Sequence, residues 1–375
     1  MRIALLDPPN FTPPYDDSLA SALARRGNEV HLLASPDLYG SVREADGYRR
    51  EETFLPVSGR LLRGRPRSPL RVPAKALEYV PSVRRSLRRL EALRPDVVHV
   101  QWLGIPRYDV RWLRRVARRY PTLLTAHDVL ARRTWNAGAW GEALRLVDRV
   151  VVHSERAVEE LAGLGLARAK VAQVTHAVFE PPPGYVAKAP TGTTLLFFGT
   201  IRAYKGLDVL VRALPALARD VPGARLLVAG QALDPVDPVR ELAERTGVAE
   251  RIEWRLGYVP PAEVAPLLEQ GALCVLPYLR LDSSGVLATA LGHGRPVVVS
   301  DVGSLGTIVR AHAAGRAVPP GEPGALAAAC AELLTSPEAL AAAARGAAAA
   351  RGALTWEAAA AAHERLYADV VAERS

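Results

Sequence analysis

The sequence predicts an α/β protein with two domains, each built on a parallel, doubly wound sheet. Its first segments alternate as strand Arg2–Leu6, helix Leu19–Arg26 and strand Glu29–Ala34. This βαβ pattern implies parallel strands joined by right-handed crossovers. From Thr194 onward, short apolar runs again alternate with segments of helical periodicity. A length of 375 residues exceeds one typical core, and it suits two domains of fewer than about 200 residues each.

Composition places the chain among ordinary globular proteins, with 49% hydrophobic and 23% charged residues. Cys274 and Cys330 lack the spacing of a metal site or a disulfide framework, which indicates a reducing compartment. The apolar stretch Ile3–Leu6 is too short for a signal peptide or a membrane helix. We therefore expect a cytoplasmic protein.

The rest of the first domain follows the same alternation. We interpret Arg43–Pro73, rich in Arg, Pro and Gly, as a long loop excursion that could contain one hairpin. The elements expected after it are helices Ala74–Leu93 and Val110–Arg119 and strands Asp96–Gln101, Thr122–Ala126, Arg149–His153 and Val171–Thr175. The Pro-rich segment Glu180–Thr191 is the expected linker. We place the domains at residues 1–183 and 184–355.

The second domain shows a clear strand–helix period. Its expected strands are Thr194–Phe198, Ala224–Ala229, Ile252–Arg255, Ala272–Leu276 and Pro296–Ser300, and its expected helices are Leu207–Ala218, Val239–Thr246, Pro261–Glu269, Glu322–Leu334 and Pro337–Arg351. The last segment, Trp356–Val371, is an amphipathic helix.

A phosphate site is predicted where the strand Thr194–Phe198 turns into a helix. Gly199 ends the strand, Arg202 lies in the short loop, and Lys205 precedes the helix. Unpaired N–H groups and a positive dipole end make a helix N-terminus favourable for an anion. Two adjacent cations suit a diphosphate better than a single carboxylate.

A second helix start supports this prediction. Asp282, Ser283, Ser284 and Gly285 precede an apolar helix, with Ser or Asp in the usual N-cap position. Two further strands end at polar or glycine residues of the same sheet edge, namely Gly230, Gln231 and Tyr258. We expect these positions to surround the base and ribose of a nucleotide.

In the first domain, His127 and Asp128 follow the strand Thr122–Ala126. The carboxyl end of a parallel strand is where α/β folds form ligand sites. Trp135 and Trp140 follow in a loop and could supply an apolar or sugar-stacking wall. The first loop contains Asn10 and Tyr15 and lacks the glycine fingerprint of a dinucleotide fold, which disfavours a nicotinamide enzyme.

Basic residues are concentrated between Arg60 and Arg94, which holds eleven of them against Glu78 and Glu91. Arg84, Arg85, Arg88 and Arg89 are expected along one side of a helix. The plain interpretation is a solvated helix face. The functional one is docking on the anionic inner face of a membrane, at about 1 kcal/mol for each basic side chain. Nucleic acid is a weaker candidate, because no binding motif accompanies the charge.

Together these features resemble the family 4 retaining glycosyltransferases of the GT-B fold. The family's Gly…Lys-Gly loop is matched by Gly199 and Lys205-Gly206, and its Gly-x-Pro-Val-Val-x-Ser/Thr-Asp stretch by Gly294–Asp301. Its Glu-x7-Glu pair is replaced by Leu281 and Thr289, and Asp282 is the neighbouring carboxylate that remains.

The resemblance implies two Rossmann-like domains facing an interdomain cleft. It implies that residues 1–183 bind the acceptor and residues 184–355 the nucleotide-sugar donor, and that the helix at about 356–375 returns to the first domain. The implied chemistry is transfer of a hexosyl group, with retention, from a nucleoside diphosphate sugar to a glycan, lipid-linked or small-molecule acceptor. His127 would reach the reacting sugar or acceptor, and Tyr258 would cover the base. The loop with Asn10 and Tyr15 would lie beside the acceptor.

No Asp-x-Asp motif occurs in the sequence, so we expect no metal, and Arg202 and Lys205 would stabilise the leaving diphosphate instead. Three alternatives stay open at this point. They are a nucleotide-sugar epimerase of the same fold, a non-catalytic sugar-nucleotide or glycan binder, and a nicotinamide enzyme.

Overall fold

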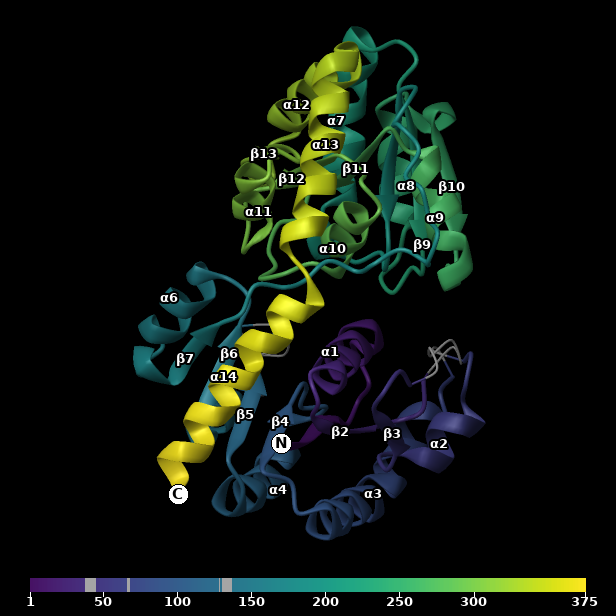
Figure 1. The fold of residues 1–375 in the computed structure, drawn as a ribbon. Helices are drawn as coiled ribbons and strands as arrows, with labels where there is room; N and C mark the ends of the chain where they lie inside the picture. The colour runs from purple at the N-terminus through teal and green to yellow at the C-terminus, as the bar shows by residue number, and fades with distance from the viewer. Residues whose placement is uncertain (38–44, 66–67, 128, 130–136) are drawn as a thin grey trace. The chain divides into compact units, whose positions relative to one another are not determined.

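The computed structural model describes residues 1–37, 45–65, 68–127, 129 and 137–375. It divides into two compact units (Figure 1). Unit 1 comprises Met1–Thr175 and Trp356–Ser375, and unit 2 comprises His176–Thr355. Each unit contains one sheet, and all strands within it pair in parallel.

The sheet of unit 1 has seven strands in the order β3-β2-β1-β4-β5-β6-β7. Their bounds are β1 Arg2–Asp7, β2 Glu29–Ala34, β3 Arg49–Glu52, β4 Val97–Val100, β5 Thr122–Thr125, β6 Arg149–Val152 and β7 Val171–Gln173. The helices are α1 Pro13–Arg25, α2 Pro56–Leu61, α3 Arg71–Leu93, α4 Pro106–Arg119, α5 Ala137–Leu146, α6 Glu155–Gly163 and α14 Trp356–Arg374.

Helices cover both faces of this sheet, as the alternation along β4 shows. Val98 and Val100 pack into a core with α3, α4, α5 and α6. His99, between them, points to the opposite face, where its Nδ1 lies 2.7 Å from the hydroxyl of Tyr367 on α14. Helix α14 also packs along α1 (Figure 1). The C-terminal helix is therefore part of the core of unit 1.

The described residues of Arg43–Pro73 form no hairpin, and the segment is not a plain loop either. The segment instead supplies β3, which pairs in parallel with β2 at the sheet edge, and the short helix α2. The residues of β3 are Arg-Arg-Glu-Glu, so they carry no apolar alternation that a sequence pattern could reveal.

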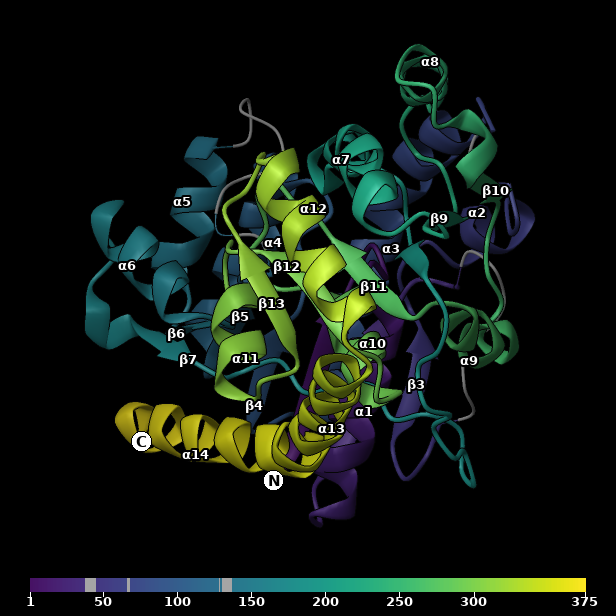
Figure 2. The same ribbon diagram turned by 90° about the horizontal axis from the view of Figure 1, so that it is seen from above.

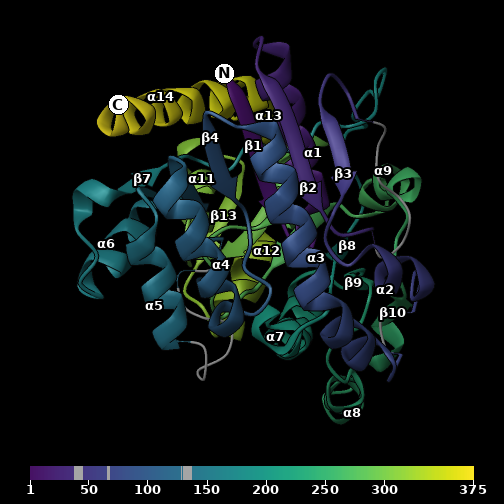
Figure 3. The same cartoon turned by 90° about the horizontal axis from the view of Figure 1, so that it is seen from below.

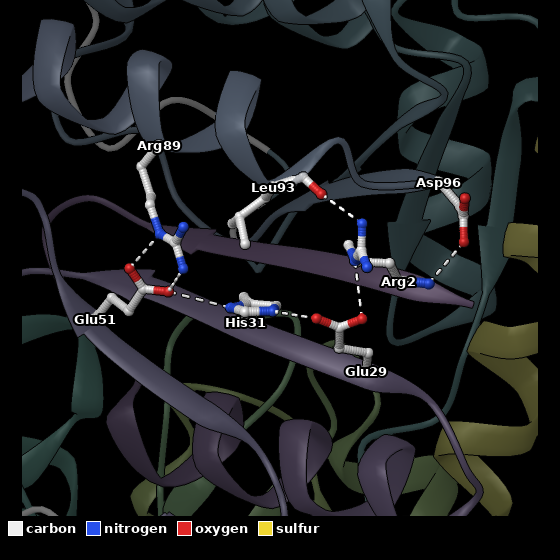
Figure 4. A network of polar contacts seen from close by, with 7 residues as sticks. All are labelled: Arg2, Glu29, His31, Glu51, Arg89, Leu93 and Asp96. Atoms are coloured by element: carbon white, nitrogen blue, oxygen red, sulfur yellow. Dashed lines mark hydrogen bonds and ion pairs between the residues drawn. The ribbon is translucent and has the colours of Figure 1, made fainter.

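Polar contacts hold this edge strand in place (Figure 4). Arg89 of α3 donates to both oxygens of Glu51 at 2.5 and 2.7 Å, and Glu51 lies 3.1 Å from His31 Nδ1. The other ring nitrogen of His31 contacts Glu29, which accepts from Arg2 at 2.8 Å. The Arg89 guanidinium is the largest cause of a lowered pKa at Glu51. Arg89 therefore faces the sheet, and placing it with the outward arginines was wrong.

The sheet of unit 2 has six strands in the order β10-β9-β8-β11-β12-β13. Figure 2 shows β11, β12 and β13 side by side in this order. Their bounds are β8 Thr194–Phe198, β9 Arg225–Gly230, β10 Ile252–Leu256, β11 Leu273–Leu276, β12 Val297–Ser300 and β13 Gly315–Val318. The helices are α7 Leu207–Asp220, α8 Asp237–Arg245, α9 Pro261–Gln270, α10 Gly285–Gly292, α11 Leu305–Ala311, α12 Pro323–Thr335 and α13 Pro337–Ala353.

Two apolar cores sandwich the sheet of unit 2. One contains buried side chains of α7, α8 and α12, the other contains those of α9, α10 and α11, and α13 contributes to both. Strand β13 and helix α11 were not predicted from the sequence, and they are only four and seven residues long.

Within the described residues, no individual helix combines the length and apolarity needed to cross a membrane. One bent pair of helices, Pro323–Thr335 with Pro337–Arg374, meets the criterion for a membrane span by length and composition only.

Candidate functional site

The candidate donor-site residues of unit 2 follow four neighbouring strands. Tyr258 comes after β10, Gly230 is the last residue of β9 and Gln231 follows it, and Gly199 directly follows β8. Asp282–Gly285 follow β11. Because these strands are adjacent and parallel, their carboxyl ends share one edge of the sheet.

Glycines permit close backbone approaches at this edge. Gly199 has φ 102°, and a Cβ there would lie 2.8 Å from Val286 Cγ2 in the first turn of α10. Gly230 has φ 141°, and its Cβ would lie 1.9 Å from the carbonyl oxygen of Gly199. The loops after β8 and β9 are joined further by Ile201, whose N–H donates to Gln231 at 2.8 Å. No larger residue fits Gly199 or Gly230 without movement.

Lys205 is a buried cation at the start of α7. Its side chain is 6% exposed, and its Nζ lies 5.4 Å from the ring centroid of Tyr278. In the part of the chain that the structure describes, its ammonium has neither a hydrogen-bond acceptor nor a carboxylate partner. Burial, with a smaller effect of the nearby Arg202 charge, lowers the pKa of Lys205 to about 8. An anion beside Lys205 would relieve this burial cost.

Arg202 is held by a carboxylate that the sequence analysis missed. Its Nη1 lies 3.1 Å from Asp234 Oδ1, and the N–H of Ala203 donates to Asp234 Oδ2 at 2.9 Å. Asp234 lies in the loop after β9, next to β8 in the sheet. Nothing in its local sequence marks it, because the contact depends on strand order. The Arg202 side chain stays 43% exposed and can still meet a ligand.

The second helix start is capped as predicted. Ser284 Oγ accepts from the N–H of Leu287 at 3.3 Å, which defines Ser284 as the N-cap of α10. Ser283 and Gly285 flank it, and Asp282 is 8% exposed. The carbonyl oxygen of Asp282 accepts from both the N–H and the hydroxyl of Ser304, at 2.8 and 2.9 Å. The turn that begins α11 therefore supports this loop.

The two predicted helix starts lie against each other. The N–H of Leu279 donates to the carbonyl of Tyr204 at 2.8 Å, which joins the loop after β11 to the residues before α7. Tyr278 extends the connection, since its ring centroid lies 5.4 Å from the Lys205 ammonium. Tyr278 was also missed, although it lies only two residues after β11, a strand that was predicted from the sequence.

Gln231 and Tyr258 lie at the far end of this edge. Gln231 is half-buried, and Tyr258 is 38% exposed. Gly257, just before Tyr258, donates its N–H to the carbonyl of Gly230 at 3.0 Å. The side chains of Gln231 and Tyr258 therefore lie close to Gly230 and are accessible to a ligand bound at this edge of the sheet.

In unit 1, His127 lies at the carboxyl end of β5 among aromatic rings. Its ring stacks on Trp102, which follows β4, with centroids 4.8 Å apart and an interplanar angle of 15°. Tyr15 of α1 meets it edge-on, at 4.8 Å and 88°. His127 is 7% exposed. The same strand-end rule that selected His127 applies to Trp102, which the sequence analysis did not select.

Hydrogen bonds define which nitrogen of His127 carries the proton. His153 Nδ1 lies 2.9 Å from the carbonyl of Val174 and must donate to it. Burial lowers the pKa of His153 to about 4, so the ring is neutral and its Nε2 accepts from His127 Nδ1 at 3.3 Å. His127 Nε2 lies 3.4 Å from Gln101 Oε1, so its role as an acceptor requires the Gln101 amide to turn its Nε2 toward the ring, and that Nε2 has no hydrogen-bond partner among the described residues in the present orientation.

Tyr15 and Asn10 occupy different positions in the first loop and α1. Tyr15 is 3% exposed and also packs on His153 and Trp356. Asn10 has φ 54°, and its side-chain oxygen accepts from Arg50 at 3.3 Å.

The loop that holds Asn10 is organised by a buried carboxylate. The oxygens of Asp7 accept from the backbone N–H groups of Asn10 and Phe11 at 2.9 Å each, and from that of Thr12 at 3.4 Å. Asp128 and Trp135, the other predicted acceptor residues, lie outside the described residues. Among those that are described, no group of three or more His, Cys, Asp or Glu side chains is arranged to hold a metal ion.

Family models match both halves of the chain. The model described as Glycosyltransferase Family 4 matches residues 17–178, and the one described as Glycosyl transferases group 1 matches residues 192–336. Solved structures at low identity share the fold across both units. Sucrose-phosphate synthase from Thermosynechococcus elongatus aligns with a TM-score of 0.74 at 20% identity, covering 100% of each chain. Anabaena HepE in complex with UDP-glucose gives 0.71 at 16% identity, covering 98% and 100%. The fold is therefore GT-B.

Curated relatives extend the similarity along most of the sequence. A D-inositol 3-phosphate glycosyltransferase from Segniliparus rotundus is 29% identical, covering 92% of this chain and 81% of its own. A phosphatidyl-myo-inositol mannosyltransferase from Mycobacterium leprae is 27% identical, covering 89% and 87%. A glycogen synthase from Mycobacterium tuberculosis is 30% identical, covering 73% and 69%. The chain belongs to glycosyltransferase family 4, also described as glycosyl transferases group 1.

Proposed function

We propose that this glycosyltransferase moves a hexosyl group from a nucleoside diphosphate sugar to a hydroxyl of a glycan, lipid-linked or small-molecule acceptor, with retention at the anomeric carbon and without a metal ion. Unit 2 would bind the donor, and unit 1 would supply acceptor contacts. The single observation that carries the proposal is the burial of Lys205 with no carboxylate partner among the described residues. Lys205 lies next to Arg202 and to the turn at Gly199.

Lys205 supports a diphosphate ligand more strongly than a neutral one. A buried ammonium without a counter-ion is costly, and burial, with a smaller effect of the Arg202 charge, accordingly lowers the pKa of Lys205. A phosphate oxygen beside it would supply both the missing acceptor and the missing charge. Arg202, guided by Asp234, adds a second cation, and the N-terminal end of α10 adds unpaired N–H groups.

The chemistry follows from where charge develops. As the bond between the anomeric carbon and the diphosphate oxygen breaks, its electron pair goes to the leaving diphosphate. Lys205 and Arg202 stabilise that charge, and removing one such contact should cost about 10²–10³ in rate. The acceptor hydroxyl attacks from the same face, and its proton passes to the departing phosphate oxygen. Atoms and charge balance without a base from the protein.

The remaining roles are assigned by position. Gln231 and Tyr258 would contact the base or ribose, and Asp282 the sugar or ribose hydroxyls. In unit 1, a hydroxyl of the acceptor or sugar would replace the Gln101 amide at His127 Nε2, a contact that is long at 3.4 Å. The acceptors named for the relatives are inositol 3-phosphate and phosphatidyl-myo-inositol, and both are polyols.

A two-stage experiment tests the proposal. Thermal shifts with UDP, GDP, ADP and their glucose and mannose derivatives identify the donor. Release of the nucleoside diphosphate is then measured with and without an acceptor extract, and NMR gives the anomeric configuration of the product. Acceptor-dependent release with retention supports the proposal. Donor conversion without an acceptor, as for an epimerase, or binding without turnover, would overturn it.

A further inference from the structure

Large hydrophobic side chains are exposed together on α2 and the first half of α3. Six of the sixteen exposed large hydrophobics among the described residues lie between positions 57 and 80. We call this set the apolar ridge, and it consists of Val57, Leu61, Leu70, Val72, Leu77 and Val80. Leu77 is 83% exposed, the highest value of the set. Clustered exposure of this kind marks an interaction surface, whereas single exposed hydrophobics need no explanation.

The ridge stands on a fixed support. Both oxygens of Glu78 on α3 accept from the first turn of α2, from the N–H groups of Val57 at 2.8 Å and Ser58 at 2.7 Å. These bonds lower the pKa of Glu78 and tie α2 to α3 (Figure 3). Opposite the ridge, Ser82, Ser86, Leu90 and Leu93 of α3 are buried. The ridge side chains are therefore held outward.

Charge follows the ridge along the same helix face. Pro73, Leu77, Val80, Arg84 and Arg88 are all exposed and are spaced by three or four residues, so they form one outward line. The line is apolar in its first half and basic in its second. We call the exposed arginines Arg84, Arg85 and Arg88 the basic stripe. Unlike Arg89, none of the three makes an ion pair with a described carboxylate.

We propose that this surface docks unit 1 on an anionic lipid bilayer, with the apolar ridge inserted at the level of the acyl chains and the basic stripe on the headgroups. Apolar side chains flanked by cations match the two layers of a membrane interface. A protein partner would need a surface that is both apolar and acidic. A second copy of this chain that paired the two ridges side by side would bring the two basic stripes together, and like charges repel. The proposal is independent of the transferase chemistry, and its test does not use activity.

Vesicle sedimentation tests the charge contribution. Wild-type protein should bind phosphatidylcholine vesicles containing phosphatidylglycerol, should bind pure phosphatidylcholine vesicles much more weakly, and should be released by high salt. Arg84→Glu/Arg88→Glu should weaken binding by at least about tenfold. The matched control Arg219→Glu/Arg345→Glu makes the same charge change at exposed positions of unit 2 and should bind as wild type does.

Site-specific fluorescence tests the apolar contribution. Cys274 and Cys330 are buried, each 1% exposed, so an environment-sensitive label will attach at an added cysteine. A label on Leu77→Cys should shift to the blue with anionic vesicles and be quenched by doxyl-labelled acyl chains. A label on Val186→Cys, at an 81% exposed position of unit 2, should do neither. Leu77→Gln should weaken vesicle binding by about tenfold.

Other results overturn the proposal. Equal binding of the charge-reversed variant and its control would remove the role of the basic stripe. A Leu77→Cys label that stays in water on bound vesicles would remove insertion of the ridge. If wild-type protein does not bind anionic vesicles but self-associates, and Leu77→Gln abolishes the self-association, the apolar ridge is instead an interface between two copies of this chain.

Discussion

The carboxylate of Asp234 accepts hydrogen bonds from two groups of the loop between β8 and α7, the guanidinium of Arg202 at 3.1 Å and the backbone N–H of Ala203 at 2.9 Å. The Arg202 side chain is 43% exposed, so the ion pair itself should contribute less than about 1 kcal/mol to stability. Its value is positional, because it limits the orientations of a long cationic side chain beside the proposed diphosphate site.

Replacing Asp234 should therefore affect ligand binding more than stability. Asp234→Ala should raise the Kd of a nucleoside diphosphate about tenfold, since positioned charged contacts are worth 1–3 kcal/mol. Asp234→Asn, which keeps an acceptor for Ala203, should have an intermediate effect. Calorimetric titration measures both, and Asp208→Asn, which breaks an ion pair with Arg212 on α7, is the control. Tighter binding by Asp234→Ala would mean that the carboxylate competes with the ligand for Arg202.

Gly230 should tolerate no side chain, because of its close approach to Gly199. A Cβ would lie 1.9 Å from the Gly199 oxygen, and φ is 141°. We expect Gly230→Ala to lower the free energy of unfolding by about 3 kcal/mol or more. Gly257 offers a matched control, with φ 149° and nothing within 4 Å of the added Cβ. Gly257→Ala should cost only the backbone strain, about 1–2 kcal/mol. Equal losses in urea unfolding would contradict the steric argument.

Three buried histidines should make unit 1 sensitive to acid. Burial lowers the pKa of His153 and of His363 to about 4 and that of His99 well below its usual 6.5. The unfolded chain therefore takes up protons first as the pH falls below 6.5. The stability that the neutral histidines contribute is fully present above pH 6.5. As the pH falls toward 4, the free energy of unfolding drops by about 3 kcal/mol for each of His153 and His363.

A histidine variant separates this acid destabilisation from the effect of the buried carboxyl groups, whose raised pKa values stabilise the folded state as the pH falls. Asp7 and Asp16 are raised by burial, so they favour the folded state at low pH. The difference in unfolding free energy between wild type and His153→Gln should shrink between pH 7 and pH 4. A difference that is independent of pH would show that His153 titrates normally in the folded state.

The sequence predicted the elements that have strong periodicity and failed where contacts decide. Strand Thr194–Phe198 was predicted at its observed bounds, because five apolar or β-forming residues lie between polar and glycine boundaries. Strand β3 was missed because it is charged and is held by Arg89 and His31 rather than by apolar burial. Trp140 was expected in a loop but is buried in α5, where its indole N–H donates to the carbonyl of Val129.

The same division applies to the candidate site. Gly199, Lys205 and Ser284 could be predicted, because a strand end, a helix start and an N-cap are local patterns. Asp234 and Gln101 could not, since each acts on a residue of a neighbouring strand, and the sequence does not give strand order. The stacking of Trp102 on His127 likewise depends on β4 lying next to β5.

Calorimetry of Lys205→Met with a nucleoside diphosphate and with the matching nucleoside tests most directly whether Lys205 binds the diphosphate. We expect the diphosphate to lose about 100-fold in affinity and the nucleoside almost none. In wild type alone, diphosphate affinity should fall as the pH rises above about 8, because the lysine then loses its proton.

The unliganded variant should gain stability, by up to about 3 kcal/mol at pH 7, since the burial cost of the lysine charge is removed. That gain should disappear between pH 8 and 10.5, where wild type loses the charge in the folded state. Equal loss of nucleoside and nucleoside diphosphate binding by Lys205→Met would contradict the assignment of Lys205 to the diphosphate.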